Sequence, residues 1–216
     1  MYPVLFSIGS ISFYSYGIFV SLGFLLAVFL LIRLVHEKNL DLSFISDHFF
    51  SLLIFPLLLG RLLYVLIFWS AYGGNLLRIL YVWEGGFVLW GGVAGFLLAL
   101  LFHIRRSKEN FNKWIDVVMI ALSGGLFLES LGAFFAGKGY GKPTDLFWGM
   151  IFENTEIPYA IPIHPVQLYM AIFLFGLFVF LMSLMRRKEK DGVIGLLGLF
   201  LYALFSFLTE FWRGDD

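Results

Sequence analysis

The chain has 216 residues and no formal net charge; 60% of its residues are hydrophobic and only 14% are charged. About a quarter of the residues of ordinary soluble domains are charged, so this composition argues against a soluble globular domain, a disordered chain and a nucleic-acid-binding protein. The chain has no cysteine, which excludes disulfides and thiolate metal sites, and a reacting thiol must arrive on a partner. The composition therefore predicts a polytopic membrane protein.

Six long apolar runs follow one another along the chain. Each is long enough for a membrane-spanning helix, which needs roughly 20 residues. We expect spans at about 13–35, 49–70, 87–104, 115–136, 166–185 and 193–212. The predicted fold class is thus all-α: a polytopic bundle of about six transmembrane helices that forms a single integral membrane domain over residues 1–216.

The basic residues predict the orientation of these spans. Cytoplasmic loops of membrane proteins are enriched in Lys and Arg. Ten basic residues follow the first, third and fifth spans, and four lie in the remaining loops and near the C-terminus; the ten are Arg33, Lys38, Arg105, Arg106, Lys108, Lys113, Arg186, Arg187, Lys188 and Lys190. Both termini and the loops near 71–86 and 137–165 are therefore expected to face outward, away from the cytoplasm.

The outward loop 137–165 is the least membrane-like segment. It is rich in glycine and proline, which prevent one continuous helix. Irregular backbone near a bilayer persists only where protein or water satisfies its polar groups. We expect this loop to cap an outward-facing cavity.

Several charged residues lie within or at the ends of the apolar runs. A charge as deep as Arg61 costs at least ~2.5 kcal/mol on insertion scales, so it should face a cavity or a counter-ion. Arg61 either lines a polar pocket for a lipid head group or forms a structural ion pair with Glu129 in the fourth run. Glu210 and Arg213 share one helix face near the end of the sixth run, where simple interfacial anchoring is the alternative to a functional role.

The string from His164 to Tyr169 lies at the start of the fifth span. Pro165 suits the first turn of a helix, which puts Gln167 and Tyr169 near the outer interface. A histidine here is a candidate general base or phosphate donor, and the alternative is an interfacial hydrogen-bonding residue. Tyr16 and Tyr169 are either functional or part of an aromatic belt.

Glycines cluster at the start of the third span. Gly91 and Gly95 form a small-xxx-small pair, which predicts close approach of this span to another helix. The preceding Trp83-Glu84-Gly85-Gly86 string also permits an irregular turn close to a ligand.

Taken together, these strings resemble the bacterial prolipoprotein diacylglyceryl transferase family from about Tyr14 to Arg213. Each match is weak by itself, and their order and spacing over six spans carry the resemblance. The matching strings are Tyr16-Gly17, Gly60-Arg61 with Tyr64, Val82-Trp83-Glu84-Gly85-Gly86, Leu131 to Gly137, Tyr140-Gly141-Lys142-Pro143-Thr144, His164 to Tyr169, and Glu210-Phe211-Trp212-Arg213.

The resemblance implies that the protein transfers the diacylglyceryl group of phosphatidylglycerol to the lipobox cysteine thiol in the signal peptide of a prolipoprotein. Glycerol phosphate leaves and a thioether forms on the outer side of the membrane. Both substrates are membrane-embedded, the nucleophile comes from the partner, and neither a metal nor another cofactor is implied. Such chemistry needs donors for the phosphate, where negative charge develops, and help in forming the reactive thiolate.

The resemblance also implies roles for individual residues. The expected catalytic residues are His164 or Tyr16, which would assist thiol deprotonation, and Tyr169, which with Gln167 would orient the lipid head group. The remaining expected substrate-binding residues hold the phosphate, fix Arg213 in place, or let lipid and helices pack closely. The phosphate is held by Arg61 and Arg213, with Lys142 a weaker candidate, and Glu210 fixes Arg213. Gly132 and Gly137 allow the close packing, and Gly141 completes the set.

The chain departs from the family pattern at several positions. Arginines of the family motifs fall on Ser130 and Ser206, and a position often held by His or Tyr is Trp90. A serine hydroxyl does not replace a permanently charged, bidentate guanidinium at a phosphate. Two alternatives to a divergent enzyme are therefore a catalytically inactive relative that binds lipid or a partner membrane protein, and an unrelated transporter or channel.

Overall fold

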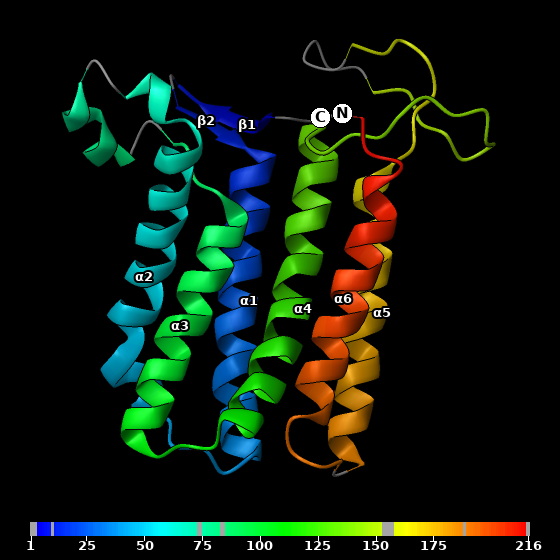
Figure 1. The fold of residues 1–216 in the computed structure, drawn as a ribbon. Helices are drawn as coiled ribbons and strands as arrows, with labels where there is room; N and C mark the ends of the chain where they lie inside the picture. The colour runs from blue at the N-terminus through cyan, green and yellow to red at the C-terminus, as the bar shows by residue number, and fades with distance from the viewer. Residues whose placement is uncertain are drawn as a thin grey trace. The chain divides into compact units, whose positions relative to one another are not determined.

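The computed structural model describes residues 4–9, 11–72, 75–82, 85–152, 158–187 and 189–214. The chain divides into two compact units: unit 1 comprises residues 1–39 and 112–216, and unit 2 comprises residues 40–111. Long helices dominate both units (Figure 1). The prediction of a single integral membrane domain stays a prediction.

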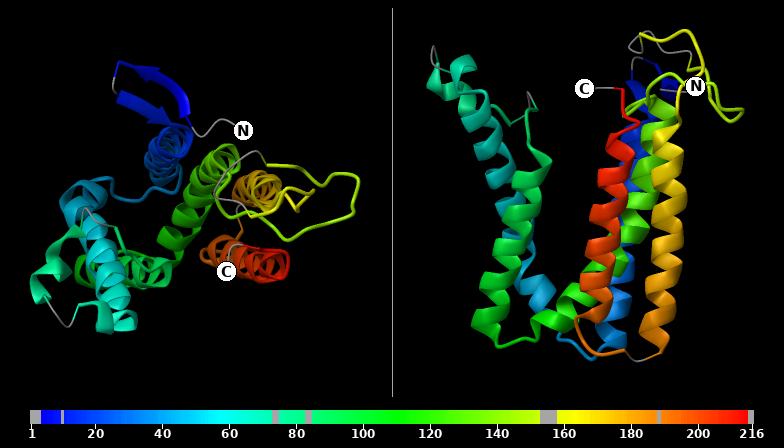
Figure 2. Two further views of the ribbon diagram at one scale, coloured as in Figure 1. Left: turned by 90° about the horizontal axis from the view of Figure 1, so that it is seen from above. Right: turned by 45° about the vertical axis from the view of Figure 1, so that its right-hand side comes forward.

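Unit 1 begins with a short hairpin, which the all-α prediction did not include, and continues with four helices. Strands β1 (Val4–Ile8) and β2 (Ile11–Tyr14) pair antiparallel, with a register irregularity between Val4 and Phe6. The helices are α1 (Ser15–Glu37), α4 (Phe111–Ala136), α5 (Val166–Arg186) and α6 (Val193–Glu210). Helix α4 lies between α1 on one side and α5 and α6 on the other (Figures 1 and 2).

Helices α1 and α4 cross at two glycines. A Cβ added to Gly23 would lie 2.5 Å from the Gly125 carbonyl oxygen, and one added to Gly125 would lie 2.8 Å from the Gly23 carbonyl oxygen. Small residues of this kind let the backbones of membrane helices approach closely. The crossing places the first turns of α1 beside the last turns of α4.

Unit 2 is a helical hairpin with an irregular connection. It contains α2 (Ser43–Ile67), the short 3-10 helices η1 (Trp69–Ala71) and η2 (Leu76–Leu80), and α3 (Leu89–Ser107). A Cβ at Gly91 would lie 2.6 Å from the Leu59 carbonyl oxygen, and a Cβ at Gly95 would lie 2.5 Å from the Phe55 carbonyl oxygen. The predicted close approach at these two glycines is thus confirmed, and the neighbour is α2.

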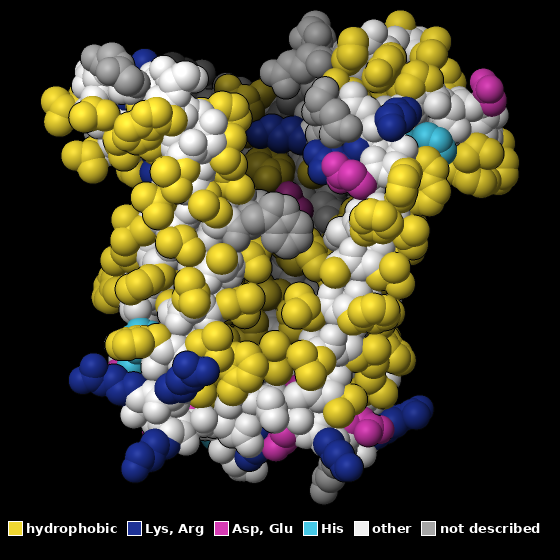
Figure 3. Space-filling view, in the orientation of Figure 1, with side chains coloured by type: hydrophobic (Ala, Val, Ile, Leu, Met, Phe, Trp, Pro, Cys, Tyr) yellow, Lys and Arg dark blue, Asp and Glu magenta, His cyan; other side chains and the backbone are white. Residues whose placement is uncertain are grey.

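The helices form where the apolar runs predict them. The second helix differs most, because it begins at Ser43 rather than near 49 and includes the polar Asp47 and His48. Five helices of the described chain, all but α3, are long and apolar enough to cross a membrane. Large side chains on them face outward, such as Leu25 and Phe29, which are 62% and 61% exposed. Figure 3 shows hydrophobic side chains along the helices and Lys and Arg at helix ends. The chain is a polytopic helical membrane protein.

Candidate functional site

Three segments that lie far apart in the sequence meet in one backbone ladder at the end of unit 1. The Gly141 N–H donates to the His164 carbonyl at 3.1 Å, and the His164 N–H donates to the Lys142 carbonyl at 3.0 Å. On the other side, the Lys142 N–H donates to the Trp212 carbonyl at 2.8 Å, and Gly141 forms a bridge with Arg213. The ladder thus joins three of the strings that carry the resemblance.

Gly141 is required by this ladder. A Cβ at this position would overlap the His164 carbonyl oxygen and would lie 2.6 Å from the His164 Cβ. A larger residue would separate the strands and move His164. The predicted involvement of Gly141 in the site therefore has a steric basis.

His164 lies in a polar aromatic cluster. Its Nδ1 is 3.1 Å from the Tyr169 hydroxyl, which also accepts a hydrogen bond from Trp148 Nε1 at 2.8 Å. The ring of Trp212 completes the cluster, with centroids 6.2 Å from His164 and 6.4 Å from Tyr169. Burial lowers the pKa of the His164 imidazole, so the neutral form is favoured.

Two cations and one carboxylate lie beside this cluster. Arg213 Nη1 is 3.2 Å from Glu210 Oε2, in an ion pair that is exposed on both sides. The prediction that these two residues share a helix face is wrong, because α6 ends at Glu210 and Arg213 lies beyond it in the bridge with Gly141, although the two side chains contact each other. Lys142 Nζ donates to the Phe211 carbonyl at 3.2 Å. Exposed ion pairs contribute little to stability, and the Lys142 side chain is also exposed.

A second group of polar residues lies between α1 and the end of α4. The Tyr16 hydroxyl donates to Glu129 Oε1 at 3.1 Å, and Lys138 Nζ lies 4.3 Å from the centroid of the Tyr16 ring. The Lys138 carbonyl accepts from Gln167 Nε2 at 2.7 Å. Gln167 is only 4% exposed, and within the described residues its Oε1 has no hydrogen-bond partner. Gln167 therefore ties this group to the first turn of α5.

Two glycines set the geometry of this second group. Gly137 has a φ of 72° and ends α4 in a Schellman motif, in which the Lys138 N–H donates to the Ala133 carbonyl at 2.9 Å. A Cβ at Gly132 would lie 2.5 Å from the Cβ of Phe19 on α1. The close helix packing expected at Gly132 is present, and Gly137 acts by turning the chain.

Arg61 is the candidate residue of unit 2, and it is only 5% exposed. Its guanidinium lies 5.9 Å and 5.6 Å from the centroids of the Tyr64 and Tyr72 rings. Its donors go to backbone oxygens of the segment before α3, namely those of Arg78, Ile79, Tyr81, Gly85 and Gly86.

Arg61 and Glu129 therefore each have partners within their own unit. The carbonyl oxygens compensate the buried guanidinium, and the Tyr16 hydroxyl contacts the carboxylate. The ion pair considered as a structural alternative is not needed to account for either charge.

The departures from the family pattern are located as follows. Ser130 is buried on α4 with 5% exposure, and Ser206 is half-buried on α6. Trp83, Glu84 and the side chain of Trp90 lie outside the described residues.

Sequence reasoning missed two members of the site. Trp148 and Trp212 both contact the His164–Tyr169 pair. Trp148 lies in none of the family strings, and Trp212 lies in the closing string but was given no role. Lys138 was not among the expected site residues, because its contact with Tyr16 depends on the cap at Gly137.

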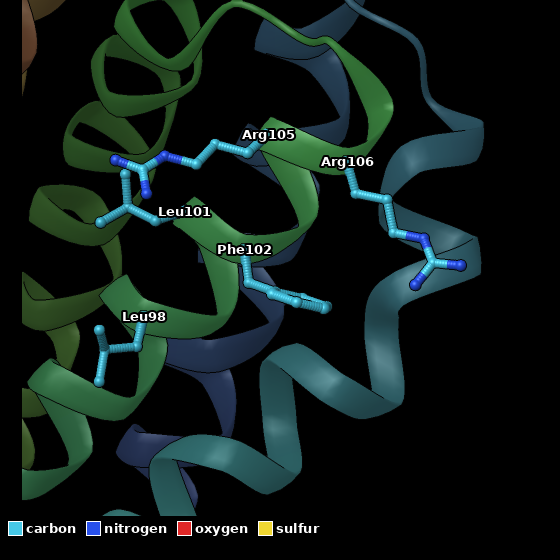
Figure 4. Close-up of a pocket in the computed structure, with 5 residues that line it drawn as sticks. All are labelled: Leu98, Leu101, Phe102, Arg105 and Arg106. Carbon is cyan, nitrogen blue, oxygen red and sulfur yellow. The ribbon is translucent and has the colours of Figure 1, made fainter.

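A pocket at the other end of α3 from Leu89 shares no residue with the candidate site. It has a volume of about 650 Å³ and is lined by Leu98, Leu101, Phe102, Arg105 and Arg106. The two arginine side chains point to opposite sides of the helix (Figure 4). This divergence does not favour joint binding of one small anion.

Comparison with known proteins gives a match over nearly the whole chain. A family model described as prolipoprotein diacylglyceryl transferase matches residues 3–216. The phosphatidylglycerol–prolipoprotein diacylglyceryl transferase of Geobacter sulfurreducens is 39% identical over 219 residues, which cover 99% of this chain and 83% of the relative. The enzyme of the same name from Clostridium tetani is 32% identical, over 100% of this chain and 86% of the relative.

Proposed function

Because the chain belongs to the prolipoprotein diacylglyceryl transferase family, we infer that it transfers the diacylglyceryl group of phosphatidylglycerol to prolipoproteins and so acts in lipoprotein maturation. The structural observation that carries this function is the ladder that joins Gly141, His164 and Arg213. It gathers donors and cations from three separate segments at one end of unit 1.

We propose that the acceptor is the lipobox cysteine thiol of the prolipoprotein signal peptide. The chain itself has no cysteine, so the sulfur nucleophile must belong to the partner. The new bond joins this sulfur to the glyceryl carbon, and the bond from that carbon to the phosphate oxygen breaks. Glycerol phosphate leaves with the electron pair, so a site for this reaction must stabilise negative charge.

The proposed phosphate donors are the cations of unit 1. Lys138 and Lys142 reach the region from the segment after α4 and Arg213 from the segment after α6, and none of the three is buried. Buried Ser130 offers only a hydroxyl where the family resemblance predicts an arginine. We assign Lys138 the main role, because its ammonium lies beside the half-buried Tyr16–Glu129 pair.

The His164–Tyr169 pair is proposed to orient the lipid head group. The Trp148 N–H holds the Tyr169 hydroxyl, and Trp212 packs against both rings. Gln167 fixes the position of Lys138 relative to α5 through its hydrogen bond to the Lys138 carbonyl.

For Arg61 we propose that it holds the segment before α3 rather than the phosphate. Its N–H donors all point to carbonyl oxygens of unit 2. Contact with a lipid phosphate would require the loss of several of these bonds, each about 1.5–3 kcal/mol when the donor is charged.

The site is proposed to face outward from the bacterial inner membrane. In support, Lys38, Lys113, Arg186 and Arg187 lie at the ends of α1, α4 and α5 that point away from the 137–165 loop. Single cysteines placed at Lys142 and Arg187 distinguish the two orientations. A membrane-impermeant thiol reagent added to whole cells should label only the cysteine at position 142.

The reaction is tested with the full chain purified in detergent. Phosphatidylglycerol and a lipobox peptide should yield the thioether-linked peptide and free glycerol phosphate, and a peptide with serine in place of cysteine should yield neither. Lys138→Ala should raise the KM for the lipid, while the exposed Arg33→Ala, at the opposite end of α1, should not.

A second candidate function is that of an inactive relative that binds lipid, and the serines at positions 130 and 206 favour it. This candidate predicts no glycerol phosphate from the parent chain and measurable release from the Ser130→Arg, Ser206→Arg double variant. Release by the parent chain would exclude it.

A further inference from the structure

The reaction needs a base that removes the thiol proton, and His164 is one candidate. The contacts of His164 argue against this role. An indole N–H only donates, so the Tyr169 oxygen is the acceptor for Trp148. Tyr169 keeps its one proton to donate, and His164 Nδ1, 3.1 Å away, is placed to accept it. A neutral imidazole whose Nδ1 accepts carries its proton on Nε2. His164 in this arrangement presents a donor, which suits a phosphate oxygen and not a thiol proton.

Glu129 is a base that none of the family strings contains. It lies two turns before the end of α4, is half-buried, and accepts the Tyr16 hydroxyl at 3.1 Å. Ionisable residues within membrane spans are costly and usually mark a functional path. Among the described residues the Glu129 carboxylate is hydrogen-bonded to one phenol and forms no ion pair with a basic side chain, so it retains capacity to accept a proton.

The groups that face this carboxylate come from three elements. Tyr16 approaches from α1, Tyr202 of α6 lies within electrostatic range of Glu129, and Lys138 lies over the Tyr16 ring from the segment after α4. The phenol is thus placed between a proton acceptor inside the bundle and a cation at its end.

We propose that Glu129, acting through the Tyr16 hydroxyl, takes up the proton of the acceptor thiol. The inference rests on the proposed function. The thiol proton passes to the Tyr16 oxygen as the Tyr16 proton passes to Glu129 Oε1. The thiolate attacks the glyceryl carbon, the sulfur–carbon bond forms, and the carbon–oxygen bond breaks with its electron pair on the departing phosphate.

Lys138 and Glu129 have separate roles in this step: Lys138 binds the negative charge of the phosphate, and Glu129 receives the proton. The Lys138 ammonium pairs with the phosphate that leaves, while protonated Glu129 returns its proton to water after the product departs. Tyr16 is the catalytic residue because it contacts the thiol, and Glu129 is a positioning residue that holds the proton. Glu129, one position before Ser130, thereby has a role that a site with the family arginine at position 130 would not need.

The test compares Glu129→Gln, Glu129→Asp and Tyr16→Phe with the parent chain in detergent. General-base catalysis contributes about 10²–10⁴-fold, so Glu129→Gln and Tyr16→Phe should lower kcat at pH 7 by at least about 100-fold with little change in the KM for the lipid. Glu129→Asp should keep part of the rate. The exposed Glu37→Gln, which breaks only the Arg33 pair on the surface of α1, serves as the matched control.

A pH profile separates loss of a base from loss of structure. Free cysteine has a pKa of about 8.5, so the deficit of Glu129→Gln should shrink as the pH rises to about 9.5, where the thiolate forms without a base. A selenocysteine peptide, already ionised at pH 7, should restore the rate of the same variant. A deficit that is constant with pH and not rescued would overturn the inference, as would full activity of Glu129→Gln at pH 7.

These outcomes also separate the inference from the proposed function. A parent chain that releases no glycerol phosphate overturns both. An active parent with an equally active Glu129→Gln variant overturns only the role of Glu129.

Discussion

Removal of the Asp116 carboxylate is expected to destabilise unit 1 strongly. Asp116 is fully buried and accepts the N–H groups of Gly192 at 3.0 Å and Gly195 at 2.7 Å, so it caps α6 from a different helix. It also lies 3.4 Å from Lys38 Nζ. Loss of a cap costs about 0.5–2 kcal/mol, and each unsatisfied buried N–H costs about 1–3 kcal/mol. These costs overlap, so we expect Asp116→Ala to lower the free energy of unfolding by about 3–5 kcal/mol.

The matched control is Asp191→Ala. Asp191 contacts the same ammonium, Lys38 Nζ, at 3.2 Å, but its side chain is 35% exposed and it caps no helix in the described contacts. Exposed pairs contribute about 0.2–1 kcal/mol. Both variants are unfolded in detergent micelles by denaturant titration and followed by circular dichroism. A loss for Asp116→Ala that does not exceed the loss for Asp191→Ala would refute the capping argument.

Three further predictions concern the site and its supports. Arg61→Ala should expose the segment before α3 to protease, because its five carbonyl acceptors lose their donor, and Arg61→Lys should restore only part of the protection. Gly132→Ala should cost about 1–3 kcal/mol in a denaturant titration through overpacking, whereas Gly176→Ala, where a Cβ meets no atom within 4 Å, should cost nothing. The lowered pKa of His164 means that the unfolded chain binds more protons below about pH 6.5, so stability should fall on acidification below that pH, and His164→Gln should weaken this dependence in unfolding midpoints.

The helices were predictable because the bilayer imposes one strong rule. Long apolar runs bounded by polar loops locate all six helices of the described chain, and the last three agree with the predicted spans within a few residues. The start of α2 was predicted late because Asp47 and His48 continue the helix beyond the apolar run. The hairpin of β1 and β2 was missed because its alternation is short and follows directly into α1.

The partners of the buried charges were not predictable in the same way. The acceptors of Arg61 are backbone carbonyls, which every residue possesses, so no side chain in the sequence identifies them. Asp116 was not singled out in the sequence, because its role depends on where α6 begins. The contact of Glu129 with Tyr16 required the relative rotation of two helices, which apolar periodicity does not determine.

The glycine crossing of α1 and α4 bears on how a lipid reaches the Tyr16 hydroxyl. The two helices approach most closely at Gly23 and Gly125. Beyond this crossing, on the side away from Tyr16, the Asp116–Lys38 contact joins the end of α1 to the start of α4. Separation of the first turns of α1 from the last turns of α4 would strain the Asp116–Lys38 contact, so opening of the bundle by helix separation is costly. The exposed Lys138 side chain lies over the Tyr16 ring, and rotamer changes of exposed side chains take picoseconds to nanoseconds, far less than a rearrangement of packed helices.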